Sequence, residues 1–275
     1  MSGPRPWSKE YIERRQETLW RIVRDEALLA DFAARRPLPA GHGSGLDERC
    51  VEYPWVLSAL RPGPERLLDA GSALNHPWLL DLPVFRGKGL HILTLAPEPY
   101  CAWSAGFSYL YADLRDIPIR DGYYERIVCI STLEHVGFDN SVYAGEAHRE
   151  CGPPGEHLNA LRELSRVLAP GGELLLTLPF GRQENLVLAQ QFDSALLAEL
   201  VEAFAPARAE QTFYRYGPDG WRLADEAACA DAAYARWAID YFLDPGGYDL
   251  NAAPVDADRA PAARAVACLR LTKRG

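Results

Sequence analysis

The stretch "RLLDAGSALNHPW", residues 66–78, has the pattern of a buried strand that runs into a nucleotide-binding turn. Two leucines lead to Asp69, and Gly71 follows where a chain that leaves a parallel sheet bends toward the next segment. A dinucleotide fingerprint has further glycines, but this turn has Ala73 and Asn75 in their place. The stretch therefore predicts a nucleotide turn without the glycine cradle that a pyrophosphate requires.

Strands and helices alternate along the chain from residue 66 onward. Four short apolar runs, "ERLLDAG", "HILTLAP", "ERIVCIS" and "GELLLTLP", are typical of buried parallel strands. The helix patterns "EHLNALRELSRVL" and "DSALLAELVEAFAP" flank the fourth run, and the strand-like "AEQTFYRY" and "ARAVACLRLTK" come last. The order predicts an α/β fold with a doubly wound, mostly parallel sheet. In such a fold the ligand site lies at the carboxyl ends of the strands.

The segment before the first strand is predicted to be a helical extension over residues 1–46, and residues 47–275 to be the main domain. Helical spacing predicts one helix over residues 8–36, with Ser8 as its cap. The glycine-rich "AGHGSGL" shows no core residue, so we interpret it as a hinge or a lid. "VEYPWVLSALRPGPE" then predicts a short apolar helix that ends at prolines.

Composition excludes several classes of protein. A chain of 275 residues with 48% hydrophobic residues can bury a sizeable core. Its net charge of −9 argues against nucleic acid and against an anionic membrane surface as partners. The six cysteines have no paired spacing, so the sequence predicts neither a disulfide framework nor a zinc ribbon. With no signal peptide pattern and no membrane-spanning run, we expect a reduced, cytoplasmic protein.

Two blocks carry a family resemblance. The run "YADLRDIPIRDGYYERIVCISTLEHVG", with "LNALRELSRVLAPGGELLLTLPFG" behind it, resembles the class I S-adenosylmethionine-dependent methyltransferases of the small-molecule type. The resemblance covers residues 53–181 well and the final strand more loosely. It implies a Rossmann-like sheet of seven strands with an antiparallel last strand at the sheet edge. It also implies S-adenosylmethionine as cofactor and S-adenosylhomocysteine as product.

The chemistry of this cofactor agrees with the turn. S-adenosylmethionine has no phosphate, so three glycines are unnecessary, and Gly71 alone lets the backbone approach the ligand. Amides of the turn or of a following helix can receive the carboxylate of the methionine part. An NAD site would instead need G-x-G-x-x-G and an acid at the end of the next strand.

The resemblance implies a set of cofactor-binding positions at three strand ends. These positions are Asp69, Ala70, Gly71, Ser72, Thr94, Leu95, Asp113, Leu114, Ile130 and Ser131. Asp69 and Gly71 would hold the methionine and ribose portions, and Asp113 would accept a hydrogen bond from the adenine amine. Related enzymes commonly place an acid that grips both ribose hydroxyls where this chain has Thr94, and Glu98 is the candidate to reach the ribose instead.

His135 is the candidate catalytic base, because its ordinary pKa near 6.5 suits proton abstraction at neutral pH. A buried histidine bonded to a neighbouring carbonyl would give the same sequence, so both interpretations stay open. His148 and Glu150 are reserve bases in the long segment 137–156, which we interpret as a lid or binding loop. The candidate substrate contacts are Tyr53, Trp55, Tyr143 and His148. The spacing of the histidines and Cys151 matches no compact zinc pattern, so no metal site is predicted.

The sequence thus favours methyl transfer to a small polar acceptor, a hydroxyl of a sugar or of a natural product. Two alternatives are a non-catalytic binding module that retains the fold and a nicotinamide-dependent oxidoreductase. The expected partner is a small molecule, with no nucleic acid and no membrane. A homo-oligomer is left open, with the N-terminal helix as a candidate cap over the site or dimer contact.

Overall fold

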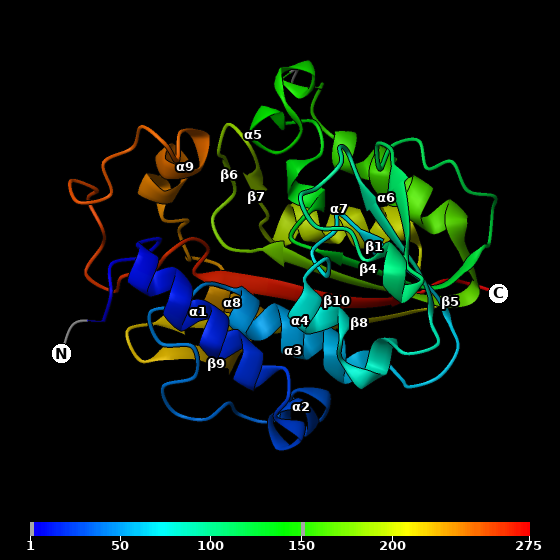
Figure 1. Cartoon of the computed structure of the whole chain (residues 1–275), viewed down its shortest axis with the longest axis horizontal. Helices are drawn as coiled ribbons and strands as arrows, with labels where there is room; N and C mark the ends of the chain where they lie inside the picture. The colour runs from blue at the N-terminus through cyan, green and yellow to red at the C-terminus, as the bar shows by residue number, and fades with distance from the viewer. Residues whose placement is uncertain (1–2, 150–151) are drawn as a thin grey trace. The chain divides into compact units, whose positions relative to one another are not determined.

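The computed structural model describes residues 3–149 and 152–275 (Figure 1). Its chain forms two compact units, which are described separately here. Unit 1 consists of Met1–Ala59, Pro179–Ser194 and Thr212–Ala267, and unit 2 of Leu60–Leu178, Ala195–Gln211 and Cys268–Gly275. The predicted division between residues 1–46 and 47–275 stays a prediction.

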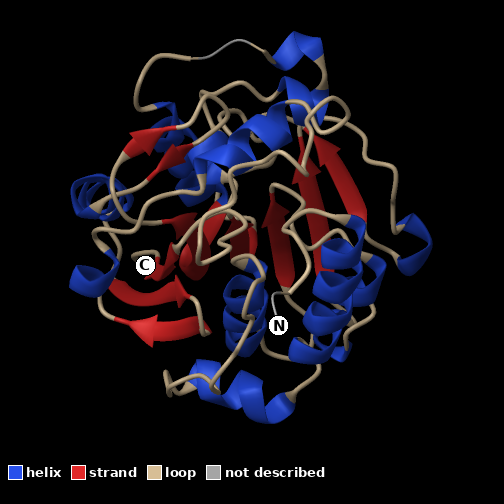
Figure 2. Ribbon diagram, turned by 90° about the vertical axis from the view of Figure 1, so that its left-hand side faces the viewer, coloured by secondary structure: helices blue, strands red, loops and turns tan. Residues whose placement is uncertain are grey.

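Unit 2 contains the parallel strands, drawn as red arrows in Figure 2. They are β1 (Arg66–Ala70), β2 (Gly89–Thr94), β3 (Ser108–Tyr111), β4 (Tyr124–Ile130) and β5 (Leu168–Pro179, whose last residue belongs to unit 1). Their order is β3-β2-β1-β4-β5, and each neighbouring pair is parallel. The strand order reverses between β1 and β4, and such a switch point is where doubly wound sheets bind ligands. The predicted α/β class and its four apolar strands are confirmed.

Burial explains why the four runs read as continuous apolar sequence. In β1, Leu67, Leu68 and Ala70 are all fully buried, so both faces of the strand are covered. The helices of this part of the chain are α4 (Pro77–Leu80), α5 (Ser141–Ala144), α6 (Glu156–Val167) and α7 (Ser194–Phe204, whose first residue belongs to unit 1). Four short 3-10 helices are η1 (Pro83–Phe85), η2 (Trp103–Ala105), η3 (Leu133–His135) and η4 (Glu146–His148).

The last strand, β10 (Ala265–Thr272), is antiparallel as predicted, but the prediction that it lies at the sheet edge is wrong. It lies between β5 and β8 (Arg208–Gly217). In unit 2 the Gly171 amide donates to Lys273 O at 3.2 Å, and the Ala207 amide donates to Thr272 O at 2.8 Å. Residues 265–269 are fully buried, and a strand that is apolar on both faces suits an interior position.

Unit 1 begins with three helices, α1 (Lys9–Ile22), α2 (Glu26–Ala33) and α3 (Arg49–Ala59) (Figure 1). The Ser8 cap is confirmed, because its Oγ accepts from the Tyr11 amide at 3.3 Å. The prediction of one continuous helix over residues 8–36 is wrong. Asp25 begins a new helix by accepting from the Leu28 amide at 3.0 Å, and an aspartate in this position stabilises a helix start rather than a helix interior.

The interpretation of "AGHGSGL" as a hinge or lid is also wrong. His42 and Leu46 are buried, and the Trp221 amide and indole donate to their carbonyl oxygens at 2.7 and 3.0 Å. A Cβ on Gly43 would lie 2.9 Å from Trp221 Cδ1, so glycine lets the backbone approach the ring. The glycines of this segment therefore serve packing and not mobility.

The remaining strands and helices of unit 1 are short. Strand β9 pairs antiparallel with β8, so the main sheet of the described residues has eight strands and not the seven that the resemblance implied. The elements are β6 (Glu184–Asn185), β7 (Gln190–Gln191), β9 (Gly220–Ala224), α8 (Glu226–Cys229) and α9 (Arg236–Leu243).

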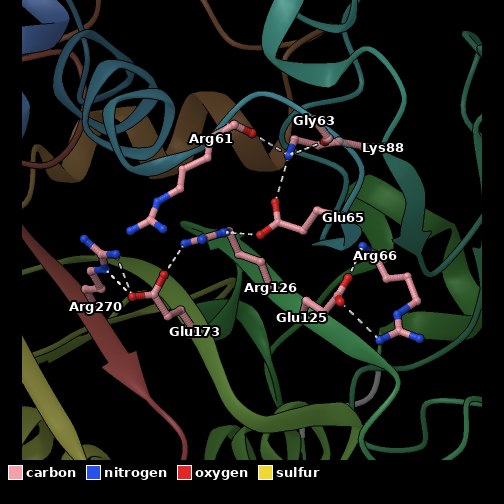
Figure 3. A network of polar contacts seen from close by, with 9 residues as sticks. All are labelled: Arg61, Gly63, Glu65, Arg66, Lys88, Glu125, Arg126, Glu173 and Arg270. Carbon is pink, nitrogen blue, oxygen red and sulfur yellow. Dashed lines mark hydrogen bonds and ion pairs between the residues drawn. The ribbon is translucent and has the colours of Figure 1, made fainter.

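Buried cations gather at the amino ends of the parallel strands in unit 2 (Figure 3). The side chain of Lys88 is 1% exposed, and its ammonium donates to Glu65 Oε2 at 2.8 Å. Arg126, whose side chain is 7% exposed, donates to Glu65 Oε1 at 2.9 Å and pairs with Glu173, which Arg270 also contacts. Burial acts to raise the pKa of Glu65, but the bonds with Lys88 and Arg126 outweigh it and lower this pKa.

We predict that Glu65→Gln destabilises unit 2, because two buried cations would lose their shared carboxylate. Breaking a buried pair costs about 3–5 kcal/mol, which urea denaturation at pH 7 would measure. The lowered pKa means that this stability is present above the ordinary carboxyl pKa and is lost as pH falls through the folded-state value. The difference between variant and wild type should therefore shrink in acid.

The control for this prediction is Glu125→Gln. Glu125 pairs with Arg66 at 3.3 Å, and its side chain is 49% exposed, so its loss should cost about 0–1 kcal/mol. Equal losses in the two variants would contradict the idea that the buried cations depend on Glu65.

Candidate cofactor and active site

Asp69, at the carboxyl end of β1, closes the turn that follows. The residue is fully buried, and its Oδ2 accepts from the Leu74 amide at 2.9 Å. Burial raises the pKa of this carboxyl to about 8, the Leu74 and Ala73 amides oppose the rise, and the charge of Glu98 adds to it. Asp69 is therefore mostly protonated at neutral pH, and its predicted contact with the cofactor stays a prediction.

Gly71 brings the β1 turn against the segment that follows β4. Its φ is +107°, and a Cβ there would lie 2.6 Å from Thr132 Cβ. Next to these two residues, Ser72 and Ser131 adopt the left-handed region, with φ of 58° and 40°. Left-handed backbone at non-glycine residues costs energy and is enriched at functional sites. The two predicted strand ends thus meet, with strained backbone on both sides.

A hydrogen-bonded cluster joins the β1 turn to the segment after β2. Glu98 accepts from the Ser72 hydroxyl and, at 2.7 Å, from the Asn75 side-chain amide. Asn75 also donates to Tyr100 O at 3.0 Å and accepts from the Tyr109 hydroxyl at 2.8 Å. We call Ser72, Asn75, Glu98 and Tyr109 the turn cluster. Sequence reasoning treated Asn75 as a lost glycine and so missed its part in the site.

The other predicted cofactor positions on β1, β2 and β4 are mostly covered. Ala70 and Ile130 are fully buried, so only their backbones are available to a ligand. Thr94, the last residue of β2, and Leu95, which follows it, are partly exposed. Their contacts with the cofactor stay predictions.

Asp113 and Leu114 follow β3, where Asp113 forms a two-bond ion pair with Arg115. The guanidinium donates to Oδ1 at 3.0 Å and to Oδ2 at 2.7 Å, and its other nitrogen pairs with Glu156 at 2.5 Å. Burial acts to raise the pKa of Asp113, but Arg115, helped by the charge of His148, lowers it. Asp113 is an ionised acceptor, next to the buried Leu114. No pattern in the sequence indicated that Arg115 would orient Asp113.

His135 ends η3, directly after β4. Its amide donates to Thr132 O at 3.0 Å, so it lies next to the residue that packs on Gly71. Its ring lies 5.4 Å from the Tyr143 ring at 79°, and Tyr143 is 59% exposed. The structure therefore brings two predicted residues of the active site together.

The segment 137–156, which we interpreted as a lid or binding loop, contains α5 and η4. Its Asn140 amide donates to His148 O at 2.9 Å, and the charge of His148 acts on Asp113. The predicted roles of His148 as a substrate contact and reserve base stay predictions. The reserve base Glu150 and Cys151 lie outside the described residues.

Tyr53 and Trp55 belong to α3 in unit 1 and are buried, with 2% and 7% exposure. Their predicted role in substrate binding stays a prediction. Within residues 3–149 and 152–275 no group of three or more histidine, cysteine or acidic side chains is arranged to hold a metal ion. None of the helices in that part of the chain is long and apolar enough to cross a membrane.

We predict that Asp69→Asn flattens the pH dependence of stability. The folded-state pKa of about 8 lies above the ordinary 3.8, so the stabilisation by the bound proton is complete below pH 3.8 and is lost as pH rises through 8. An asparagine keeps the bond from the Leu74 amide and does not ionise. Melting temperatures of the ligand-free variant should match or exceed wild type at pH 8 and vary less between pH 4 and 8. A parallel decline in both proteins would contradict this.

Comparison with known proteins identifies part of the chain. Residues 93–176 match the family model of a methyltransferase domain, and this span holds Thr94, Asp113 and His135. A comparison with curated proteins found no match.

The chain is similar to many solved structures, three of which illustrate the range of similarity. The 1,6-didemethyltoxoflavin-N1-methyltransferase of Burkholderia thailandensis is 13% identical, with 97% of this chain and 86% of that chain covered and a TM-score of 0.45. The sarcosine dimethylglycine methyltransferase proposed from Galdieria sulphuraria is 16% identical, with 80% and 82% covered and a TM-score of 0.46. The [4+2]-cyclase SpnF is 15% identical, with 99% of each chain covered and a TM-score of 0.47.

The family match and the sheet agree on one conclusion. The matched span begins within β2 and ends within β5, and it includes β3 and β4 on either side of the switch point. Residues 93–176 of the chain therefore match a methyltransferase domain, and they lie on a doubly wound sheet of the Rossmann-like type.

Proposed function

We propose that this protein transfers a methyl group to a hydroxyl of a small polar acceptor, such as a sugar or a hydroxylated natural product. The observation that carries the proposal is the position of His135. It lies beside Thr132, which packs on the Gly71 turn, and its ring meets the exposed Tyr143. This position supports His135 as the group that accepts a proton from the hydroxyl of the methyl acceptor.

The residues present fit the parts of S-adenosylmethionine. Gly71 gives the single close backbone approach that a ligand without phosphate needs. The carboxylate of Glu98 retains acceptor capacity for ribose hydroxyls, and the ionised Asp113 can accept from the adenine amine. Ser131, left-handed at the end of β4, would line the methionine arm.

In the proposed mechanism, the residues of this chain position the methyl acceptor and remove its hydroxyl proton. When bound, S-adenosylmethionine supplies a methyl group on a sulfonium whose departure leaves a neutral thioether. The protein aligns the acceptor and excludes water from it, with Tyr143 as the wall beside His135. As the oxygen–carbon bond forms, the hydroxyl proton passes to a ring nitrogen of His135. The proposal also includes a small-molecule partner and a reducing, cytoplasmic location, in keeping with the free thiols of Cys50, Cys101, Cys129, Cys229 and Cys268.

We expect S-adenosylhomocysteine to raise the melting temperature of the protein. A ligand that binds only the native state adds about 2.7 kcal/mol of stability at a hundredfold excess over its dissociation constant. Asp113→Ala should weaken this binding in calorimetry, because the adenine amine would lose its acceptor. Asp116→Ala is the control, since Asp116 is exposed on the same turn. Unchanged affinity in the Asp113→Ala variant would contradict the adenine contact and give Asp113 only a structural role in the turn.

We expect His135→Ala to lower turnover by about 100- to 10,000-fold, the usual contribution of a positioned base. Formation of S-adenosylhomocysteine with a panel of sugars and hydroxylated compounds would measure it. Affinity for the cofactor should stay nearly unchanged, because the base faces the acceptor. His135→Asn keeps a hydrogen-bonding side chain without a base, so near-normal turnover in that variant would reduce His135 to a structural role.

A further inference from the structure

Asn75 joins three segments of the cofactor site through all of its side-chain polar atoms. The residue is 4% exposed, and its amide nitrogen donates to Glu98 Oε2 at 2.7 Å and to Tyr100 O at 3.0 Å. Its Oδ1 accepts from the Tyr109 hydroxyl at 2.8 Å, and that hydroxyl accepts from the Ala102 amide at 2.7 Å. One buried side chain thus holds the β1 turn, the segment after β2 and the strand β3 in fixed relation.

Each oxygen of the Glu98 carboxylate accepts one hydrogen bond from a neighbouring side chain. Its Oε1 accepts from the Ser72 hydroxyl and its Oε2 from Asn75. An ionised carboxylate has about four lone-pair positions, so two acceptor positions remain, one on each oxygen. Two acceptors on neighbouring oxygens match the two adjacent hydroxyls of a ribose. Thr94, at the position where related enzymes place an acid, offers a single hydroxyl instead.

We propose that Asn75 is a positioning residue for the cofactor, which fixes the Glu98 carboxylate so that Glu98 receives both ribose hydroxyls. The inference rests on the proposed use of S-adenosylmethionine. It assigns Glu98 the part that Thr94 cannot fill, and it explains why an asparagine stands where a glycine is usual. A glycine at position 75 would leave Glu98, Tyr100 O and the Tyr109 hydroxyl without this partner.

Only an amide fits these three contacts with a short side chain. The site requires two N–H donors and one acceptor on the same side chain, which asparagine supplies. An aspartate has nearly the same shape but no donor, and it would set a second carboxylate against Glu98. Two carboxylates at hydrogen-bond distance do not both ionise freely, so the pair would take up a proton. With aspartate at position 75, the position of the Glu98 carboxylate should therefore depend on pH.

The first test is Asn75→Asp, with the affinity for S-adenosylhomocysteine measured by calorimetry at pH 5.5 and pH 8. We expect binding at least about tenfold weaker than wild type at pH 8. A carboxylate at position 75 would repel Glu98 from its position, and repulsion between two close carboxylates amounts to about one pKa unit or more, which equals a factor of about ten in an equilibrium constant. Binding should approach wild type at pH 5.5, where a shared proton restores the bond to Glu98. Asn185→Asp is the control, because it adds the same charge at an exposed position and should follow wild type at both pH values.

The second test separates positioning of Glu98 from a purely structural role. In the double variant Asn75→Asp with Glu98→Gln, the donor and the acceptor change places, so the hydrogen bond between the two positions is restored. We expect most of the melting temperature to return and the pH dependence to disappear. Affinity should stay weak, because an amide at position 98 no longer offers two acceptor oxygens to the ribose. Full recovery of affinity in this variant would overturn the inference.

Failure of the inference can be told from failure of the proposed function. If wild-type protein does not bind S-adenosylhomocysteine, both are overturned. If wild type binds and folded Asn75→Asp has the same affinity and the same pH profile, only the role of Asn75 and Glu98 is overturned.

Discussion

The contact of Gly71 with Thr132 is the constraint on which the site depends. The turn after β1 and the segment after β4 approach so closely that a Cβ at position 71 would lie 2.6 Å from Thr132 Cβ. Because β1 and β4 flank the switch point of the sheet, this approach closes one side of the ligand-binding edge. Ser72, next to Gly71, and Ser131, next to Thr132, both adopt the left-handed backbone conformation. His135 follows, and its amide donates to Thr132 O. Glycine is required here for close packing between two strand ends.

Buried ionisable side chains are stabilised differently at the amino ends and at the carboxyl ends of the parallel strands. At the amino ends, Glu65 neutralises Lys88 and Arg126, so the buried cations have a shared partner (Figure 3). At the carboxyl ends, Asp69 is buried without a cation, and its raised pKa keeps it protonated. Glu98, nearby, accepts only from neutral donors. The carboxylate at the amino ends is thus paired with cations, whereas the two at the carboxyl ends accept hydrogen bonds from neutral donors.

Local sequence predicted those features whose cause is local. The apolar runs became strands because burial on both faces selects continuous apolar residues, as in β1. Ser8 was recognised as a helix cap because its partner lies three residues away. The sequence does not predict the helix break at Asp25, because the helical periodicity continues across it. It does not predict the packing of Gly43 on Trp221 either, because these two residues lie far apart along the chain.

The sequence by itself determined the class of fold, and it predicted the strand ends of the candidate site and, through a resemblance, the cofactor. Only the tertiary structure decided that β10 lies inside the sheet, that Arg115 orients Asp113, and that Asn75 and Glu98 belong to one cluster. The physical reason is the sequence separation of these contacts. Asn75 meets its partners 23 to 34 residues away, and no local propensity or periodicity records a hydrogen bond across that distance. Such contacts exist only once neighbouring strands have paired and brought their ends together.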